Sequence, residues 1–173
     1  MNTERSLDFQ IAFEQRVAKM YQQIGERFSS KTLSINSKDN LWKNLARDER
    51  KHVAILKIAK SFLKTGTRIT KPVEISPESQ EKIETMLSKY EAKIYNGINE
   101  SEAIEVLSHL EDYDEAFFLP LLKATDSKLL SQFPKYSKSF QLHERRVQKG
   151  LQNYKNPGRR KTDKKPTEGK TDV

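Results

Sequence analysis

Apolar residues recur at intervals of three and four along most of the chain, and no long stretch alternates with a period of two. Such spacing puts apolar side chains on one face of an α-helix. It predicts an all-α protein whose helices cover about 7–28, 39–64, 77–96, 99–123 and 135–154. A further helical turn is expected within 126–133.

Local signals fix several helix ends. Ser76 is expected to cap the third helix, because Pro77 suits the first helical position. Either Asn99 or Ser101 is expected to cap the fourth helix. Within that helix, Pro120 should kink or end the regular hydrogen bonding, since proline donates no backbone hydrogen bond.

Four of these helices are long enough to span a bundle, and the connection over 64–99 holds the extra helix between two loops. A connection of that length can cross from one end of a bundle to the other. We therefore expect one helical domain over 1–154. The segment 155–173 has seven basic and three acidic residues and almost no apolar side chain. It is expected to be a disordered basic tail, which either keeps the protein soluble or binds nucleic acid weakly.

Composition removes several classes of function. The 173 residues include no cysteine, which excludes disulfide scaffolds, cysteine zinc sites, iron–sulfur clusters and thiol nucleophiles. No stretch approaches the length of a membrane span, and residues 1–10 lack the apolar core of a secretory signal. The expectation is a cytoplasmic protein without a membrane partner.

The apolar faces of the four long helices carry acids where core residues belong. The acidic and imidazole side chains on these faces are Glu14, Glu49, His52, Glu111, Asp114 and Glu144. Burying unpaired carboxylates costs several kcal/mol each, and no lysine or arginine shares these faces. Divalent cations would neutralise the carboxylates, and four glutamates balance two such ions. For any single helix, a misjudged helical phase is the alternative.

These residues resemble the rubrerythrin-like branch of the ferritin-like superfamily. The stretch LWKNLARDERKHVAIL over 41–56 is similar to the Glu-x-x-His helix of that family, with Glu49 and His52 as ligands. Glu14 with Tyr21 seven residues later matches the first helix. AIEVLSHLEDYDEAFF over 103–118 repeats that arrangement from Glu111. The resemblance implies a ferritin-like four-helix bundle with a long crossover, dimerisation, and one or two bound ions of iron or manganese.

The resemblance also implies roles for the ligands. Glu49 and Glu111 would bridge two ions, and Glu14 and His52 would complete one of them. The other ion would be held by Glu144, with Asp114 as an additional acid. Tyr21 and Tyr113 would lie just outside the ligands, and no catalytic group beyond the ligands is implied. Peroxide reduction or ferrous oxidation would be the reaction, and an external donor would supply electrons because the chain has no cysteine module.

The last helix departs from the family pattern. Aligning ERRVQKGL over 144–151 with ERKHVAIL over 49–56 puts Val147 where the second histidine belongs. His143, next to Glu144, is then expected to point about 100° away from the ligand face. A metal-poor helical bundle that acts as a structural or interaction module is therefore the alternative function.

Overall fold

A computed structural model describes residues 3–29, 38–64, 74–124 and 134–155. The regular elements in these ranges are all helices: α1 (Thr3–Ser29), α2 (Lys38–Lys64), α3 (Pro77–Asn96), α4 (Glu100–Ala124) and α6 (Pro134–Lys155). The all-α prediction is confirmed. The turn expected within 126–133, and the predicted tail apart from Lys155 at the end of α6, lie outside the described residues.

Hydrogen bonds at the helix ends explain where α3 and α4 begin. Ser76 adopts an extended conformation, and its hydroxyl accepts a hydrogen bond from the Ser79 backbone N–H at 3.1 Å. Asn99 caps α4 reciprocally: its side chain accepts from the Glu102 N–H at 3.0 Å, and Glu102 accepts from the Asn99 N–H at 2.9 Å. Of the two residues expected to cap α4, Asn99 does so. Helix α4 continues past Pro120 to Ala124, so Pro120 does not end it.

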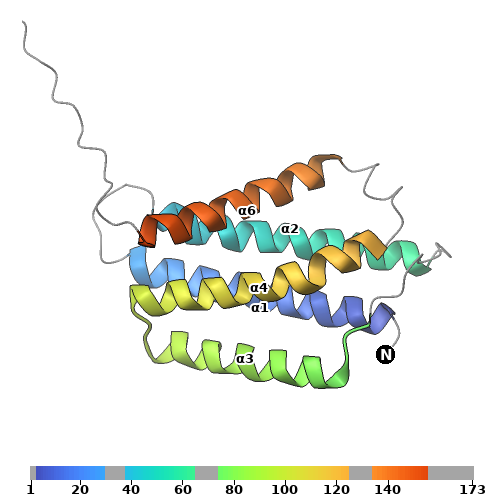
Figure 1. The fold of residues 1–173 in the computed structure, drawn as a ribbon, viewed down its shortest axis with the longest axis horizontal. Coiled ribbons are helices and arrows are strands. Elements are labelled where there is room, and N and C mark those ends of the chain that lie inside the picture. Colours follow the sequence, from blue (N-terminus) through green and yellow to red (C-terminus); the bar gives the residue numbers. More distant parts are fainter. Residues whose placement is uncertain (1–2, 30–37, 65–73, 125–133, 156–173) are drawn as a thin grey trace, which may run out of the picture.

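Contacts between neighbouring helices form a closed ring in the order α1, α2, α6 and α4. Helix α1 packs against α2, α3 and α4, and α6 packs against α2 and α4. Figure 1 shows α1 and α2 running in opposite directions, whereas α2 and α4 run in the same direction. Helix α3 makes this possible, because it returns the chain to the end of the molecule at which α2 began. The long connection between α2 and α4 therefore crosses the length of the molecule.

The apolar core fills the space between α1, α2, α3 and α4 and extends to Val147 of α6. Two glycines let helices approach closely. A Cβ atom at Gly25 would lie 3.1 Å from the Cβ of Trp42, and one at Gly150 would lie 2.8 Å from Leu41 Cδ2. A larger residue at position 150 would force the Leu41 side chain to move. None of the described helices is sufficiently long and apolar to cross a membrane.

Candidate metal centre

Six side chains with nitrogen or oxygen donors converge inside the helical ring. They come from four helices: Glu14 of α1, Glu49 and His52 of α2, Glu111 and Asp114 of α4, and His143 of α6. The α1 and α2 members are almost completely buried, with Glu14 and His52 at 0% exposure and Glu49 at 1%. Because acidic and imidazole groups are rarely buried without partners, this cluster is the feature of the interior that calls for a functional explanation.

The first group within the cluster surrounds His52. Its Nδ1 atom lies 2.8 Å from Glu49 Oε2, 3.7 Å from Glu14 Oε2 and 3.9 Å from Asp114 Oδ2. One donor atom from each of these four residues lies within 4.8 Å of the others. Three carboxylates and one imidazole are therefore close enough to share one cation.

The second group surrounds His143. Its Nε2 atom lies 2.9 Å from Glu111 Oε2 and 3.6 Å from Glu49 Oε1. Glu49 therefore belongs to both groups, with Oε2 directed to His52 and Oε1 to His143. The two imidazole rings are 5.0 Å apart between centroids, in an edge-to-face arrangement. The two groups thus lie side by side with one carboxylate in common.

Neutral side chains hold parts of the cluster in place. The Gln10 amide donates to Glu14 Oε1 at 2.8 Å and to Asp114 Oδ1 at 3.4 Å. The Tyr21 hydroxyl donates to Glu111 Oε1 at 2.7 Å. In contrast, the buried Oε2 atoms of Glu14 and Glu49 accept no hydrogen bond of regular geometry from any described residue. These two oxygens point into the cluster, where a cation would satisfy them.

Electrostatics inside the cluster favour bound protons when no cation is present. Burial raises the pKa of Glu14, and burial together with the Glu14 charge raises the pKa of Asp114 well above its ordinary value. Burial by itself would lower the pKa of both histidines. The neighbouring carboxylates outweigh this effect, so the pKa of His52 lies well above 6.5 and that of His143 rises to about 9. A cation that entered the cluster would displace these protons.

A further buried acid, Asp48, supports α6 from outside the cluster. Asp48 is 0% exposed and receives a hydrogen bond from Lys51 Nζ at 2.6 Å and another from Arg146. Its Oδ2 atom lies 3.9 Å from His143 Nδ1. Burial opposes ionisation of Asp48, but the two cations outweigh it and lower its pKa. The sequence analysis missed this residue; only its pairing with Lys51, three positions later, is visible in the sequence.

The structure corrects the prediction for the last helix. Glu144 is exposed, whereas His143, Val147 and Gly150 are buried. The inward face of α6 is therefore shifted by one residue from the predicted one, and the prediction that Glu144 points into the site is wrong. His143 lies in the cluster, so the expectation that it points away is also wrong. Val147 belongs to the apolar core one turn after His143.

The structure brings together the other five predicted ligands, namely Glu14, Glu49, His52, Glu111 and Asp114. Of the two tyrosines expected beside them, Tyr21 contacts Glu111. Tyr113 is half-buried and packs against the apolar core, and its place beside the ligands stays a prediction. The spacing of the acids along three helices was thus a sufficient signal for most of the cluster.

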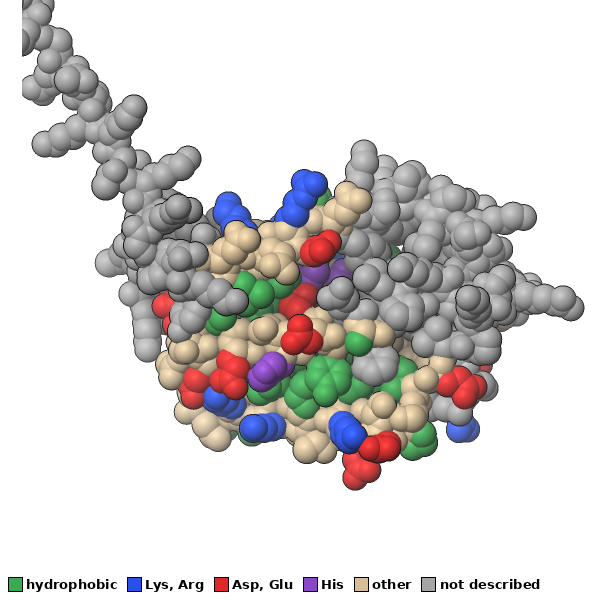
Figure 2. Space-filling model, viewed as in Figure 1, with side chains coloured by type: hydrophobic (Ala, Val, Ile, Leu, Met, Phe, Trp, Pro, Cys, Tyr) green, Lys and Arg blue, Asp and Glu red, His purple; other side chains and the backbone are tan. Residues whose placement is uncertain are grey.

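The cluster is most open along α4. The side chains of Glu111 and Asp114 are 16% and 15% exposed, in contrast to the buried members on α1 and α2. Figure 2 shows acidic and histidine side chains at the surface between α4 and α6. A small molecule could therefore reach the cluster from this side.

No protein-family model, curated protein or solved structure matches the chain. Its function is therefore inferred from the arrangement of its own side chains.

Proposed function

We propose that this protein is a ferritin-like four-helix bundle of the rubrerythrin type, which binds two iron or manganese ions and reduces hydrogen peroxide with electrons from an external donor. The ring of α1, α2, α4 and α6 supports the fold assignment. The parallel direction of α2 and α4, with α3 as the returning helix, supports it further, because a bundle with one long crossover has this connectivity.

One observation carries the proposal: two adjacent groups of buried donors share Glu49, and each includes one histidine. Glu14, Glu49, His52 and Asp114 would hold one ion, and Glu49, Glu111 and His143 the other. Carboxylate oxygens and imidazole nitrogens suit iron and manganese. The four carboxylates would balance two divalent ions, and a cation would bind the Oε2 atoms of Glu14 and Glu49, which accept no regular hydrogen bond from the described residues.

When bound, a pair of redox-active ions would supply the electron transfer to peroxide. Reduction of one hydrogen peroxide molecule takes two electrons and two protons and yields two water molecules. The protein contributes the arrangement of the ligands. Tyr21 fixes the orientation of Glu111, Gln10 fixes Glu14, and the burial of α1 and α2 at this level excludes bulk water.

Metal analysis of protein purified without chelator, after growth with added iron or manganese, tests the proposal. We expect two ions per chain, and oxidation of a reduced donor that depends on both metal and peroxide. Metal binding without this activity would restrict the function to metal binding, and it would contradict the proposed reaction.

The alternative is a metal-poor helical module with a structural or interaction role. The hydrogen bonds of Tyr21 and Gln10 to the carboxylates, and the ion pairs of the two histidines, would then help to compensate the buried charge. A metal content near zero after supplementation, with the protein fully folded, would favour this alternative.

A further inference from the structure

The charges of α2 are divided between two faces. Two of its acids, Asp48 and Glu49, are buried. Its exposed face carries cations at intervals of four, three and seven residues, which places them in one line along the helix. These cations are Lys43, Arg47, Arg50 and Lys57, here called the basic stripe. At 1.5 Å per residue the basic stripe extends over about 21 Å.

No acid neutralises the basic stripe within the described part of the chain. Arg47 donates to the neutral amide of Asn44 at 2.7 Å, and Arg50 donates to the neutral amide of Gln22. Several cations elsewhere on the surface are paired with acids. Arg16 binds Glu84 and Glu91, for example, and Lys60 binds Asp8. On the face shown in Figure 2, both acidic and basic side chains occur over α3 and α4. The basic stripe thus holds four cations that form no ion pair with an acid of the described residues.

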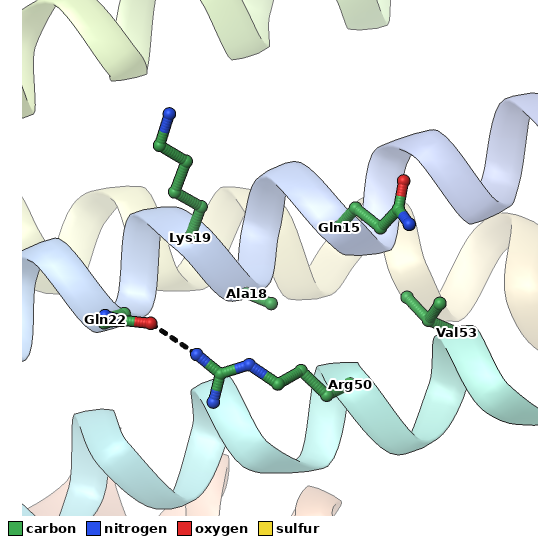
Figure 3. Close-up of a pocket in the computed structure, with 6 residues that line it drawn as sticks. All are labelled: Gln15, Ala18, Lys19, Gln22, Arg50 and Val53. Carbon is green, nitrogen blue, oxygen red and sulfur yellow. Dashed lines mark hydrogen bonds between the residues drawn. The ribbon is translucent and has the colours of Figure 1, made fainter.

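A shallow depression of about 250 Å³ lies beside the basic stripe, between α1 and α2. It is lined by Gln15, Ala18, Lys19, Gln22, Arg50 and Val53, with no acid among them. Figure 3 shows the Arg50 guanidinium extending from α2 towards Gln22 of α1, while the Lys19 ammonium points away from Arg50. An acidic side chain of a partner could enter this depression and pair with Arg50.

The basic stripe lies directly outside the candidate metal centre. Arg47 and Arg50 flank Glu49 in the sequence, and His52 lies on the opposite side of the same helical turn. One helix, about 10 Å thick, therefore separates the stripe from the cluster. The partly exposed members of the cluster are on α4. A macromolecule bound to α2 would leave the α4 side open to a small substrate.

We propose that the basic stripe is the docking surface for the acidic face of the electron-donor protein. This inference rests on the proposed function, which requires an external donor. The basic stripe lies one helix away from the cluster, which favours a redox partner over a nucleic acid. Electron transfer requires a short distance to the metal centre, whereas nucleic-acid binding does not. The stripe also offers no aromatic side chain on which bases could stack, since Ala54 and Ser61 are the other exposed residues along it.

The experiment measures binding of a small acidic redox protein, a plant-type [2Fe–2S] ferredoxin, to the full chain by isothermal titration calorimetry. Arg47→Gln/Arg50→Gln is compared with the control Lys82→Gln/Lys89→Gln on the exposed side of α3, which loses the same charge. We expect binding at low salt that weakens as salt is added. The stripe variant should bind about tenfold more weakly, whereas the control should match the wild type.

Each measurement is made on both metal-free and metal-loaded protein, which separates the two proposals. Stripe-dependent binding of ferredoxin to metal-free protein supports the docking surface. This result holds even if the protein binds no metal and the proposed function is wrong. Absence of binding at low salt, or equal weakening by the two variants, overturns the docking surface while leaving the metal centre intact. Tighter stripe-dependent binding of duplex DNA than of ferredoxin would overturn it in favour of a nucleic-acid interface.

Discussion

His143 Nε2 and Glu111 Oε2 lie 2.9 Å apart, although they belong to α6 and α4 and are separated by 32 positions in the chain. This contact closes the ring of helices at the level of the cluster. It also completes the second donor group, since Glu49 reaches the same imidazole from α2. The neighbouring Glu144 points to solvent, so adjacent residues of α6 have opposite environments.

This difference gives a direct test of the ligand assignment. His143→Ala removes the imidazole of the second group and should lower the metal content by one ion per chain. Inductively coupled plasma mass spectrometry measures this content. Glu144→Ala, one position later, should leave the content unchanged because Glu144 is exposed. The opposite pattern, with loss only in the Glu144 variant, would restore the prediction made from the sequence.

Tyr21→Phe should destabilise the protein. The variant keeps the buried ring but removes the hydroxyl that donates to Glu111 Oε1. Loss of a buried hydrogen bond to a charged group costs about 1–3 kcal/mol, which urea unfolding can measure. Tyr95→Phe is the control, because Tyr95 is 86% exposed and should change the free energy of unfolding little. An equal change in the free energy of unfolding for the two substitutions would show that the hydrogen bond from Tyr21 to Glu111 does not stabilise the protein.

Glu14→Gln should stabilise the metal-free protein and reduce the stabilisation that metal loading provides. The substitution keeps an oxygen that accepts from Gln10, but it removes a buried charge whose Oε2 atom accepts no regular hydrogen bond from the described residues. We expect the metal-free variant to gain about 1 kcal/mol. The added stability on metal loading should shrink, because the first group loses a ligand.

Thermal unfolding with and without iron or manganese measures both effects. Glu81→Gln on the exposed face of α3 is the control and should alter neither. A loss of stability in metal-free Glu14→Gln would mean that the carboxylate is already well compensated by its protein neighbours.

Metal-free protein should lose stability as the pH rises from 6.5 to about 9. The pKa of His143 rises from 6.5 in the unfolded chain to about 9 in the folded state, and the pKa of His52 is also raised, so the folded state holds more protons in this interval. Their contribution is complete below pH 6.5 and disappears as the pH passes the folded values. The raised pKa values of Glu14 and Asp114 act in the same direction.

Urea unfolding at several pH values, with chelator present, measures this slope. His143→Ala should flatten it, because the variant lacks one of the protons that are released. Asp48 does not obscure the result, because its lowered pKa affects stability only in acid, where its carboxylate becomes protonated. A free energy of unfolding that rises over this interval would contradict the assignment of protons to the cluster.

Local patterns in the sequence were sufficient for the helices and for most of the cluster. On α1, α2 and α4, apolar residues are dense enough to define one inward face. Acids on that face are buried whichever helices pack against it. Glu14, Glu49, His52 and Glu111 could therefore be identified from spacing alone. The caps at Ser76 and Asn99 are equally local, because their hydrogen bonds reach only three residues along the chain.

The inward face of α6 was decided by tertiary structure. Apolar residues are sparse in this helix, and Val147 fits both the face that includes Glu144 and the face that includes His143. The choice depends on contacts with other helices: the close approach of Gly150 to Leu41, the hydrogen bond of Arg146 to Asp48 and the contact of His143 with Glu111. These partners are far away in the sequence, so helical periodicity carries no information about them. The sequence by itself determined that carboxylates would be buried, and the packing of α6 determined which imidazole joins them.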